Sequence, residues 1–183
     1  MAIVGKPNVG KSSLLNKLVG EKVAIVTSKP QTTRTKITGI LTLGAVQYVF
    51  LDTPGIHRPR TKLGERMAKA ATESVAEVDA IMMLFEPYGE LNEAEEKLIA
   101  DIRAKHVPAV AVINKTDTLK KESDIYDRIA FLKDLSVFQD VLPISVYEEK
   151  GCKELLPMLE KYAVESPHYF PDDAYTDMPE KAL

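Results

Sequence analysis

The eight residues that most restrict what this chain can be are Gly5-Lys6-Pro7-Asn8-Val9-Gly10-Lys11-Ser12. Their spacing matches G-x-x-x-x-G-K-[S/T], the pattern of a phosphate-binding loop. A short apolar run, residues 1–4, precedes the loop, and a helix-like segment, residues 13–18, follows it. The pattern therefore stands between a strand and a helix, as the motif requires, and the alternative is a glycine-rich turn that binds nothing.

Each fixed position of this pattern has a physical role. Gly5 and Gly10 let the backbone bend until its N–H groups point at phosphate oxygens, and a helix that starts near Lys11 adds the positive end of its dipole. Lys11 is expected to reach the β- and γ-phosphates, and the Ser12 hydroxyl to bind Mg²⁺. The other residues that we expect to contact the nucleotide here are Lys6, Pro7, Asn8, Val9 and Ser13.

Composition indicates one compact domain of ordinary globular type. The chain has 183 residues, of which 45% are hydrophobic and 28% charged. Its net charge of −3 argues against nucleic-acid binding through bulk electrostatics, so any such contact is expected to be local or to lie outside this chain. The single cysteine, Cys152, excludes an internal disulfide and a multi-thiolate metal site, and is expected to be an inert thiol in a reducing cytoplasm.

Hydrophobic patterning predicts a soluble cytoplasmic protein. No apolar run approaches the roughly 20 residues of a membrane span. The first apolar run, residues 1–4, is short for the central strand of a parallel sheet, where about 5–6 residues are usual. This suggests that the N-terminus has been trimmed.

A second loop of the predicted site follows a hairpin. Residues 36–42 and 47–51 are predicted as two strands that flank Gly44, and the second strand leads into Asp52-Thr53-Pro54-Gly55. An aspartate at the carboxyl end of a buried strand is placed to hold Mg²⁺, and the Gly55 N–H can bond a γ-phosphate oxygen. Loss of that phosphate would release the loop, which is how nucleotide-dependent switches work.

Residues 21–34 form a long irregular segment, and a loop of this length in a compact domain is usually functional. Thr32 and Thr33 offer a hydroxyl that would complete Mg²⁺ coordination when a γ-phosphate is present. A plain surface loop is the alternative for this segment alone.

The segment Asn114-Lys115-Thr116-Asp117 follows an apolar run and predicts the specificity of the site. The Asp117 carboxylate can accept two hydrogen bonds, from N1–H and the 2-amino group of guanine, whereas adenine offers neither in that arrangement. Asn114 and Lys115 would brace the base and the phosphate loop. The site is therefore expected to prefer guanine nucleotides.

The remaining segments predict a doubly wound α/β fold. Buried strands are expected at 80–85, 109–113 and 141–144, and helices at 63–78, 93–105, 123–132 and 152–162. Asn92 is expected to cap the helix at 93–105. The charged residues of that helix that we expect on a solvated face are Glu93, Glu95, Glu96 and Lys97. We predict a mostly parallel six-stranded sheet with helices on both faces.

The last part of the chain differs from the rest. Residues 165–183 hold Pro167, Pro171 and Pro179 among acidic residues and show no helical or strand period until the final residues. We therefore divide the chain into a nucleotide-binding domain, residues 1–164, and a linker or tail, residues 165–183. A chain that stops soon after a linker suggests a further domain beyond it.

Together these loops resemble the G domain of translation-factor-class small GTPases, and more narrowly the Era-type bacterial ribosome-assembly GTPases. The segments that carry the narrower resemblance are Gly5-Lys6-Pro7-Asn8-Val9-Gly10-Lys11-Ser12-Ser13-Leu14-Leu15-Asn16, Gln31-Thr32-Thr33-Arg34, and Tyr169-Phe170-Pro171-Asp172-Asp173 with Thr176-Asp177. In that family such a tail leads to an RNA-binding KH domain, which this chain lacks. The resemblance covers the whole chain and implies the same P-loop GTPase fold.

The resemblance also implies roles for particular residues. Thr33 is similar to the switch threonine that binds Mg²⁺, and Asp52 to the aspartate on the Mg²⁺ side of the site. Asn8 is similar to a phosphate-loop asparagine that, in related GTPases, binds a K⁺ ion bridging the nucleotide phosphates. Such a positive charge can act in place of an arginine finger. The residues expected to be catalytic are Lys11, Thr33 and Gly55.

Two positions depart from the patterns of related enzymes. Ile56 follows Gly55 where Ras-like enzymes have a glutamine that orients the attacking water, so no side-chain base is evident and slow intrinsic hydrolysis is expected. The segment Ser145-Val146-Tyr147 replaces the more usual Ser-Ala-x, in which a backbone N–H, here that of Val146, reaches the guanine carbonyl.

The resemblance implies Mg²⁺-dependent binding of GTP and its hydrolysis to GDP, in a switch protein for small ribosomal subunit assembly. Its implied partners are ribosomal RNA and the small subunit, through the absent KH domain, with peripheral membrane association and a monomeric isolated domain. Three alternatives stay open: another ribosome- or tRNA-associated GTPase of this class, a nucleotide-binding switch with negligible turnover, and an ATP-using P-loop enzyme. The linker argues against the first and Asp117 against the third, whereas Ile56 keeps the second open.

Overall fold

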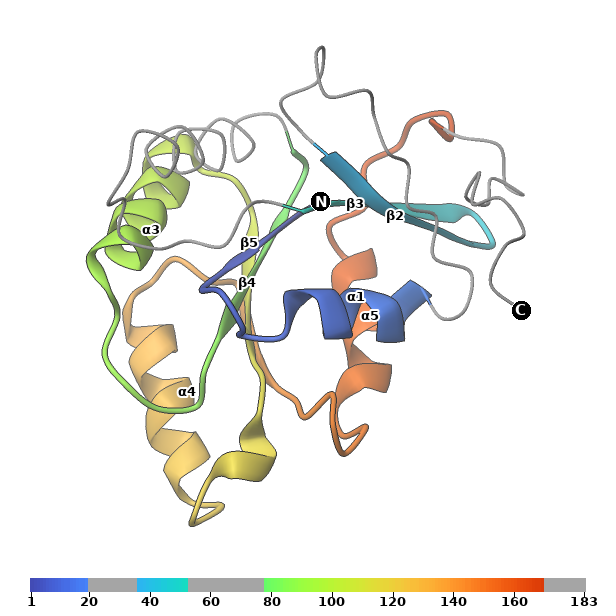
Figure 1. Ribbon diagram of the computed structural model, residues 1–183. Helices are drawn as coiled ribbons and strands as arrows, with labels where there is room; N and C mark the ends of the chain where they lie inside the picture. The colour runs from blue at the N-terminus through green and yellow to red at the C-terminus, as the bar shows by residue number, and fades with distance from the viewer. Residues whose placement is uncertain (20–35, 53–77, 170–183) are drawn as a thin grey trace.

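The computed structural model describes residues 1–19, 36–52 and 78–169. Figure 1 shows a central sheet between two layers of helices. The elements in chain order are β1 (Ala2–Gly5), α1 (Lys11–Val19), β2 (Lys36–Leu43), β3 (Val46–Asp52), β4 (Ile81–Phe85), α3 (Glu93–Lys105), β5 (Ala109–Ile113), the 3₁₀ turn η1 (Thr116–Thr118), α4 (Asp124–Asp134), β6 (Asp140–Pro143) and α5 (Cys152–Glu160).

The described strands form one six-stranded sheet in the order β2-β3-β1-β4-β5-β6. Strand β1 pairs in parallel with β3 and with β4, and β4, β5 and β6 continue in parallel. Only the pairing of β2 with β3 is antiparallel among these strands, as the predicted hairpin around Gly44 requires. Because parallel strands end at the same edge, the loops after β1, β5 and β6 converge there.

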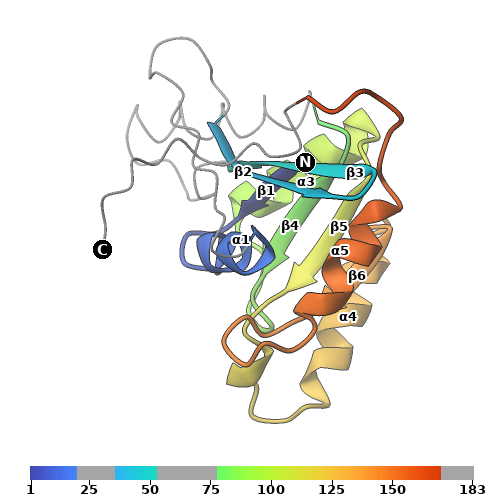
Figure 2. The same cartoon turned by 90° about the vertical axis from the view of Figure 1, so that its right-hand side faces the viewer.

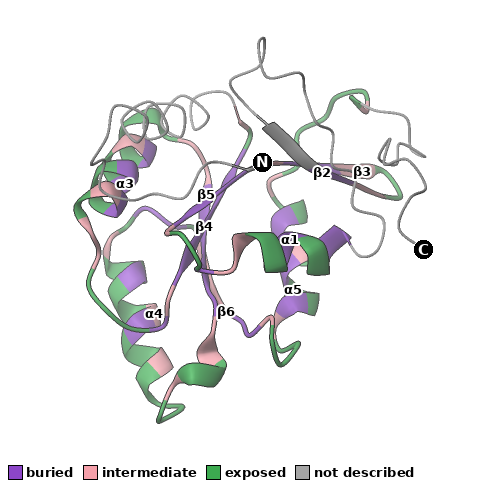
Figure 3. Cartoon of the chain, in the orientation of Figure 1, coloured by how far each residue is buried: buried purple, intermediate pink, exposed green. Residues whose placement is uncertain are grey.

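Both faces of the sheet are covered by helices, as predicted. Alternate residues of β4 point to opposite sides: Ile81, Met83 and Phe85 pack with α3 and α4, whereas Met82 and Leu84 pack with α1 and α5. Figure 2 looks onto one face of the sheet, with α1 and α5 in front of it, and Figure 3 shows buried residues along the strands and on the inner faces of the helices. Burial on both faces explains why β4 and β5 are continuous apolar runs.

Helix α3 is capped by Asn92 as predicted, but one of its glutamates is buried where the prediction placed it in solvent. The Asn92 side chain accepts from the Glu95 N–H, and the Glu95 carboxylate accepts from the Asn92 N–H, each at 2.8 Å, which forms a capping box. The expectation that Glu95 faces solvent was wrong, because its side chain is only 2% exposed. The carboxylate folds back over the first turn, where a charge pattern alone gives no sign of it.

Smaller differences concern element ends. Strand β6 begins at Asp140, one residue before its predicted start, α4 runs to Asp134 rather than to residue 132, and α5 ends at Glu160. Cys152 is buried at the start of α5, and burial raises the pKa of its thiol, which agrees with an inert cysteine. The helix predicted at 63–78 lies outside the described residues apart from its final residue, and the irregular segment at 21–34 lies outside them completely.

None of the helices within residues 1–19, 36–52 and 78–169 has the length and apolar character that crossing a membrane requires.

Arg128 of α4 holds the loop between β4 and α3 in place. Its guanidinium donates to the Glu86 carbonyl at 3.0 Å and to the Gly89 carbonyl at 2.8 Å. The cation also lies 5.9 Å from the ring centroid of Phe85 and 5.4 Å from that of Phe131. Burial lowers the pKa of Arg128, although it remains a cation at neutral pH. The loop is therefore held by α4 as well as by its own two ends.

We expect Arg128→Met to lower the free energy of unfolding by about 2–3 kcal/mol, because two backbone carbonyls lose a charged donor. Urea unfolding followed by circular dichroism measures the change. The matched control is Arg103→Met, since the exposed Arg103 side chain donates to a single carbonyl, that of Leu135, among the described residues. A loss no larger than that of the control would contradict the role given to Arg128.

Candidate nucleotide-binding site

One cavity lies where the loops after β1, β5 and β6 meet, and it has a volume of about 580 Å³. Its size and position suit a nucleotide bound at the carboxyl edge of a parallel sheet. The residues that line it are Asn8, Gly10, Lys11, Ser12, Ser13, Asn114, Lys115, Asp117, Thr118, Val146 and Tyr147. Three loops that are distant in the sequence therefore share one cavity, as predicted.

The phosphate loop turns directly from β1 into α1. The tip residue Asn8 has a φ of 62° and Gly10 a φ of 104°, so the chain passes through the left-handed region twice within three residues. The Leu14 N–H donates to the Gly10 carbonyl at 2.9 Å, which closes the first turn of α1. The N-terminal turn of α1 thus borders the cavity, and the positive end of the helix dipole favours a phosphate there.

Asn114 connects the three loops of the site. Its side-chain Nδ2 donates to the Val9 carbonyl at 3.0 Å, and its Oδ1 accepts from the Val146 N–H at 3.2 Å. The side chain is only 3% exposed. The predicted bracing role of Asn114 therefore has a definite geometry: one amide group holds the phosphate loop and the loop after β6 at once.

Lys115 makes the second link between these loops. Its Nζ donates to the Asn8 carbonyl at 2.5 Å and lies 3.6 Å from the Glu86 carboxylate. A left-handed backbone at Lys115, with a φ of 62°, turns the chain into η1, where the Thr116 hydroxyl donates to the Ile144 carbonyl at 3.0 Å. Lys115, which was predicted to brace the phosphate loop, thus binds the carbonyl at the tip of that loop.

The Asp117 carboxylate is oriented by Ser145. The Ser145 hydroxyl donates to Asp117 Oδ1 at 2.6 Å and accepts from the Glu148 N–H at 3.1 Å. Ser145 is fully buried, whereas Tyr147 beside it is 89% exposed at the rim of the cavity. A buried hydroxyl that fixes an exposed carboxylate suits recognition of the N1–H and 2-amino edge of guanine.

Three phosphate-loop residues that we expected to contact the nucleotide do not line the cavity. Val9 is buried in the core between the sheet, α1 and α5, and Pro7 is exposed. The Lys6 side chain turns away toward α3, where its Nζ lies 3.1 Å from the Glu95 carboxylate. Any contact of Lys6 or Val9 with phosphate would therefore use the main-chain N–H, as the phosphate-loop mechanism expects, whereas Pro7 has no N–H to donate.

Part of the predicted site lies outside the described residues. These positions are Thr33, Gly55 and Ile56. Asp52 is described only as the last residue of β3, where it pairs with Ile3 beside the start of the phosphate loop. Its backbone position is the one that the prediction requires.

The described residues fit a bound Mg²⁺ ion only as part of a nucleotide complex. They contain no group of three His, Cys, Asp or Glu residues that could hold a metal ion. Ser12 lies exposed at the start of α1 and lines the cavity, so its hydroxyl would act together with phosphate oxygens. Asn8 also lines the cavity, which fits its predicted place in a K⁺ site.

Sequence reasoning missed three residues that shape the site. Glu86 contacts Lys115 from the loop after β4, the Thr116 side chain binds the end of β6, and Thr118 lines the cavity. A signal existed for the threonines, because they share the segment of Asn114 and Asp117. No local signal marks Glu86, whose role depends on the neighbouring strand.

A phosphate loop after β1, an Asn-Lys-x-Asp segment after β5 and a serine-led loop after β6 define a P-loop domain of the guanine-nucleotide-binding class. The family model described as 50S ribosome-binding GTPase matches residues 1–115. The chain belongs to this family. The predicted fold class and the predicted GTPase resemblance are thereby confirmed.

Individual relatives agree with the narrower resemblance to Era. The chain is 43% identical over 183 residues to GTPase Era of Clostridioides difficile (strain 630), which covers all of this chain and 62% of that protein. A structure of Era in complex with MgGDPNP and nucleotides 1506–1542 of 16S ribosomal RNA matches with a TM-score of 0.81 at 36% identity, over 97% of this chain and 61% of the other. An Aquifex aeolicus Era variant bound to GDP.AlF4- matches with a TM-score of 0.80, also at 36% identity and with the same coverage. The chain thus spans about 62% of the length of the relatives that it matches.

We expect Gly10→Ala to destabilise the protein by about 2–3 kcal/mol, because a Cβ at this positive-φ position would run into the side-chain amide of Asn114. The matched control is Gly44→Ala in the β2–β3 turn, where φ is also positive but nothing lies within 4 Å of the added carbon. That control should cost only about 1 kcal/mol. Urea unfolding of both variants measures the difference, and equal losses would contradict the close packing of Asn114 on Gly10.

Proposed function

We propose that this protein binds GTP with Mg²⁺ and hydrolyses it to GDP and phosphate. The observation that carries the proposal is the shared cavity, which is lined by Lys11 and Ser12 and also by the Ser145-oriented Asp117 carboxylate. Phosphate recognition and guanine recognition are thus combined in one site. An adenine nucleotide would leave Asp117 without its donors, which costs binding energy.

The chain's own residues act by position and charge. The N–H groups of the phosphate loop and the first turn of α1 bind the β- and γ-phosphates, and the Lys11 ammonium neutralises charge on them. Mg²⁺, when bound, neutralises further charge on the same oxygens. Thr33 and Gly55 are proposed to complete this arrangement, and water attacks the γ-phosphorus in line with the leaving oxygen. With Ile56 beside Gly55, no side-chain base is evident at this position, so we expect a slow intrinsic rate.

Asn8 would contribute to a K⁺ site in this mechanism. It stands at the tip of the phosphate loop with a left-handed backbone, and Lys115 fixes its carbonyl. A K⁺ ion held there would place positive charge where the transition state develops negative charge, as an arginine finger does.

The biological role follows from the relatives. The family description names ribosome binding, and the solved Era complex contains 16S ribosomal RNA. We extend this to a nucleotide-dependent switch in small ribosomal subunit assembly, in the cytoplasm. Residues 1–164 would be the G domain, and residues 165–183 would lead to the RNA-binding KH domain. Peripheral membrane association and a monomeric state of the isolated domain stay predictions of the family resemblance.

Phosphate release from GTP with Mg²⁺, measured in matched KCl and NaCl, tests the proposal. We expect slow multiple turnover that is at least about tenfold faster in KCl, since a bound cation supplies charge in the transition state. Lys11→Ala is the control variant and should abolish the signal in both salts. Equal rates near zero in both salts would instead mean that the isolated domain is a nucleotide-holding switch without useful turnover.

A further inference from the structure

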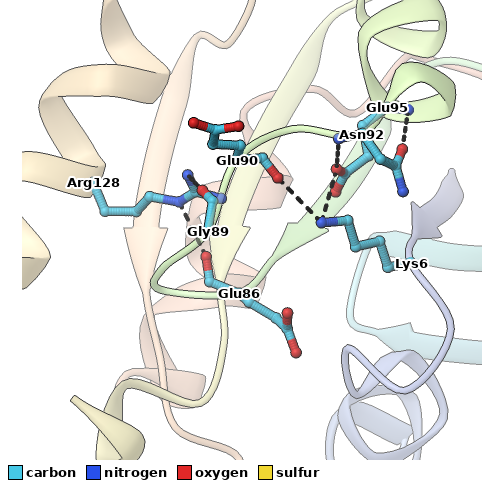
Figure 4. Close-up of polar contacts among 7 residues, drawn as sticks. All are labelled: Lys6, Glu86, Gly89, Glu90, Asn92, Glu95 and Arg128. Atoms are coloured by element: carbon cyan, nitrogen blue, oxygen red, sulfur yellow. Dashed lines mark hydrogen bonds and ion pairs between the residues drawn. The ribbon is translucent and has the colours of Figure 1, made fainter.

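The loop between β4 and α3, residues 86–92, contacts the phosphate loop and supports it. Figure 4 shows Lys6 of the phosphate loop pointing toward this loop and the first turn of α3. Its Nζ lies 3.1 Å from Glu95 Oε2 and donates to the Glu90 carbonyl at 3.3 Å. Lys6, the phosphate-loop lysine that does not line the nucleotide cavity, therefore has one partner in this loop and one in the first turn of α3.

The Glu95 carboxylate is a fixed partner rather than a mobile surface charge. Its Oε2 also accepts from the Asn92 N–H at 2.8 Å, and the Glu95 N–H in turn donates to the Asn92 side chain. The group therefore belongs to the capping box at the N-terminus of α3, where the helix dipole favours a negative charge. Lys6 meets an anion whose position is already set by the helix.

Burial separates this pair from an ordinary surface salt bridge. Exposed pairs contribute little, because water screens both charges. Here the Glu95 side chain is 2% exposed and that of Lys6 is 26% exposed. Removing Lys6 would leave a buried carboxylate with less compensation, so the pair resists separation.

The supporting loop is itself held at two further points. Arg128 donates to the Glu86 and Gly89 carbonyls, as Figure 4 shows. The Glu86 carboxylate lies 3.6 Å from Lys115 Nζ, which donates to the carbonyl of Asn8. The phosphate loop is thus tied to this segment at its base through Lys6 and at its tip through Lys115. Movement of the segment would move the main-chain N–H groups that face the phosphates.

We propose that Lys6 and Glu95 are positioning residues of the nucleotide site: their ion pair fixes the phosphate loop against the start of α3 in its phosphate-binding shape. This inference rests on the proposed function, since it concerns the same site. It assigns to the first variable position of the phosphate loop a task that is separate from contact with the nucleotide. It also means that a movement of the start of α3 would change the position of the phosphate loop.

The test is the rate at which a fluorescent GDP analogue dissociates from the 183-residue chain with Mg²⁺. Glu95→Gln keeps an acceptor for the Asn92 N–H but removes the charge that Lys6 requires. Lys6→Met keeps the length of the side chain without its charge. We expect each variant to release GDP at least about fivefold faster than the parent, a change of about 1 kcal/mol. The double variant should be no faster than the single variants, because both remove one interaction.

Two controls separate positioning from a structural role. Glu96→Gln removes an exposed carboxylate from the same turn of α3 and should leave dissociation within about twofold of the parent. Lys6→Arg, which restores the positive charge, should recover most of the slow release. A purely structural pair would lower the urea midpoint of Glu95→Gln while its dissociation rate stayed at the parent value, and this result would overturn the inference.

The failure of this inference can be told from failure of the proposed function. If the parent chain binds no GDP, the proposed function fails and the inference falls with it. If the parent binds GDP but Lys6→Met and Glu95→Gln release it at the parent rate, only the positioning role is refuted.

Discussion

The site depends on one buried amide, that of Asn114. It donates to the phosphate loop at Val9 and accepts from the loop after β6 at Val146, while its own backbone continues β5. Strands β1, β5 and β6 are among those that end at this edge of the sheet, and this side chain sets the spacing of the loops that follow them. An amide can do this because it carries a donor and an acceptor at fixed separation, whereas a carboxylate of the same shape could not donate to the Val9 carbonyl.

The polar and charged groups around Asn114 differ in burial according to their role. Two of the charges that support the loops are buried: Glu95, which pairs with Lys6 of the phosphate loop, and Arg128, which donates to the loop after β4. The Asp117 carboxylate and the neutral Ser12 hydroxyl, which would meet a ligand, are exposed. The supporting charges can therefore stay paired whether or not a nucleotide is bound, and the exposed groups remain accessible. This division is what a preorganised binding site requires.

The sequence allowed most of the fold to be predicted, because β4 and β5 are continuous apolar runs and the helices between them begin with clear signals such as Asn92. It also allowed the prediction that the three cavity loops lie together, since parallel strands end at one edge of a sheet. The burial of Glu95 and its pairing with Lys6 could not be predicted in this way. Glu95 pairs with Lys6, which is 89 positions away in the sequence, so no local pattern marks this ion pair, and a first-turn glutamate on a surface helix is usually solvated. Glu86 was missed for the same reason, whereas Thr33 and Gly55 stay predictions.

Guanine selectivity tests the central claim most directly, because it depends on the geometry of Asp117 and Ser145 rather than on phosphate binding alone. The measurement is competition of unlabelled GDP, ADP and XDP against a fluorescent GDP analogue, for the parent chain and for Asp117→Asn. The structure predicts that the parent prefers GDP over ADP by at least about a hundredfold. Asp117→Asn should weaken GDP and admit XDP, because an amide can pair with the altered purine edge. Equal competition by GDP and ADP, or an unchanged preference for GDP in Asp117→Asn, would contradict the account.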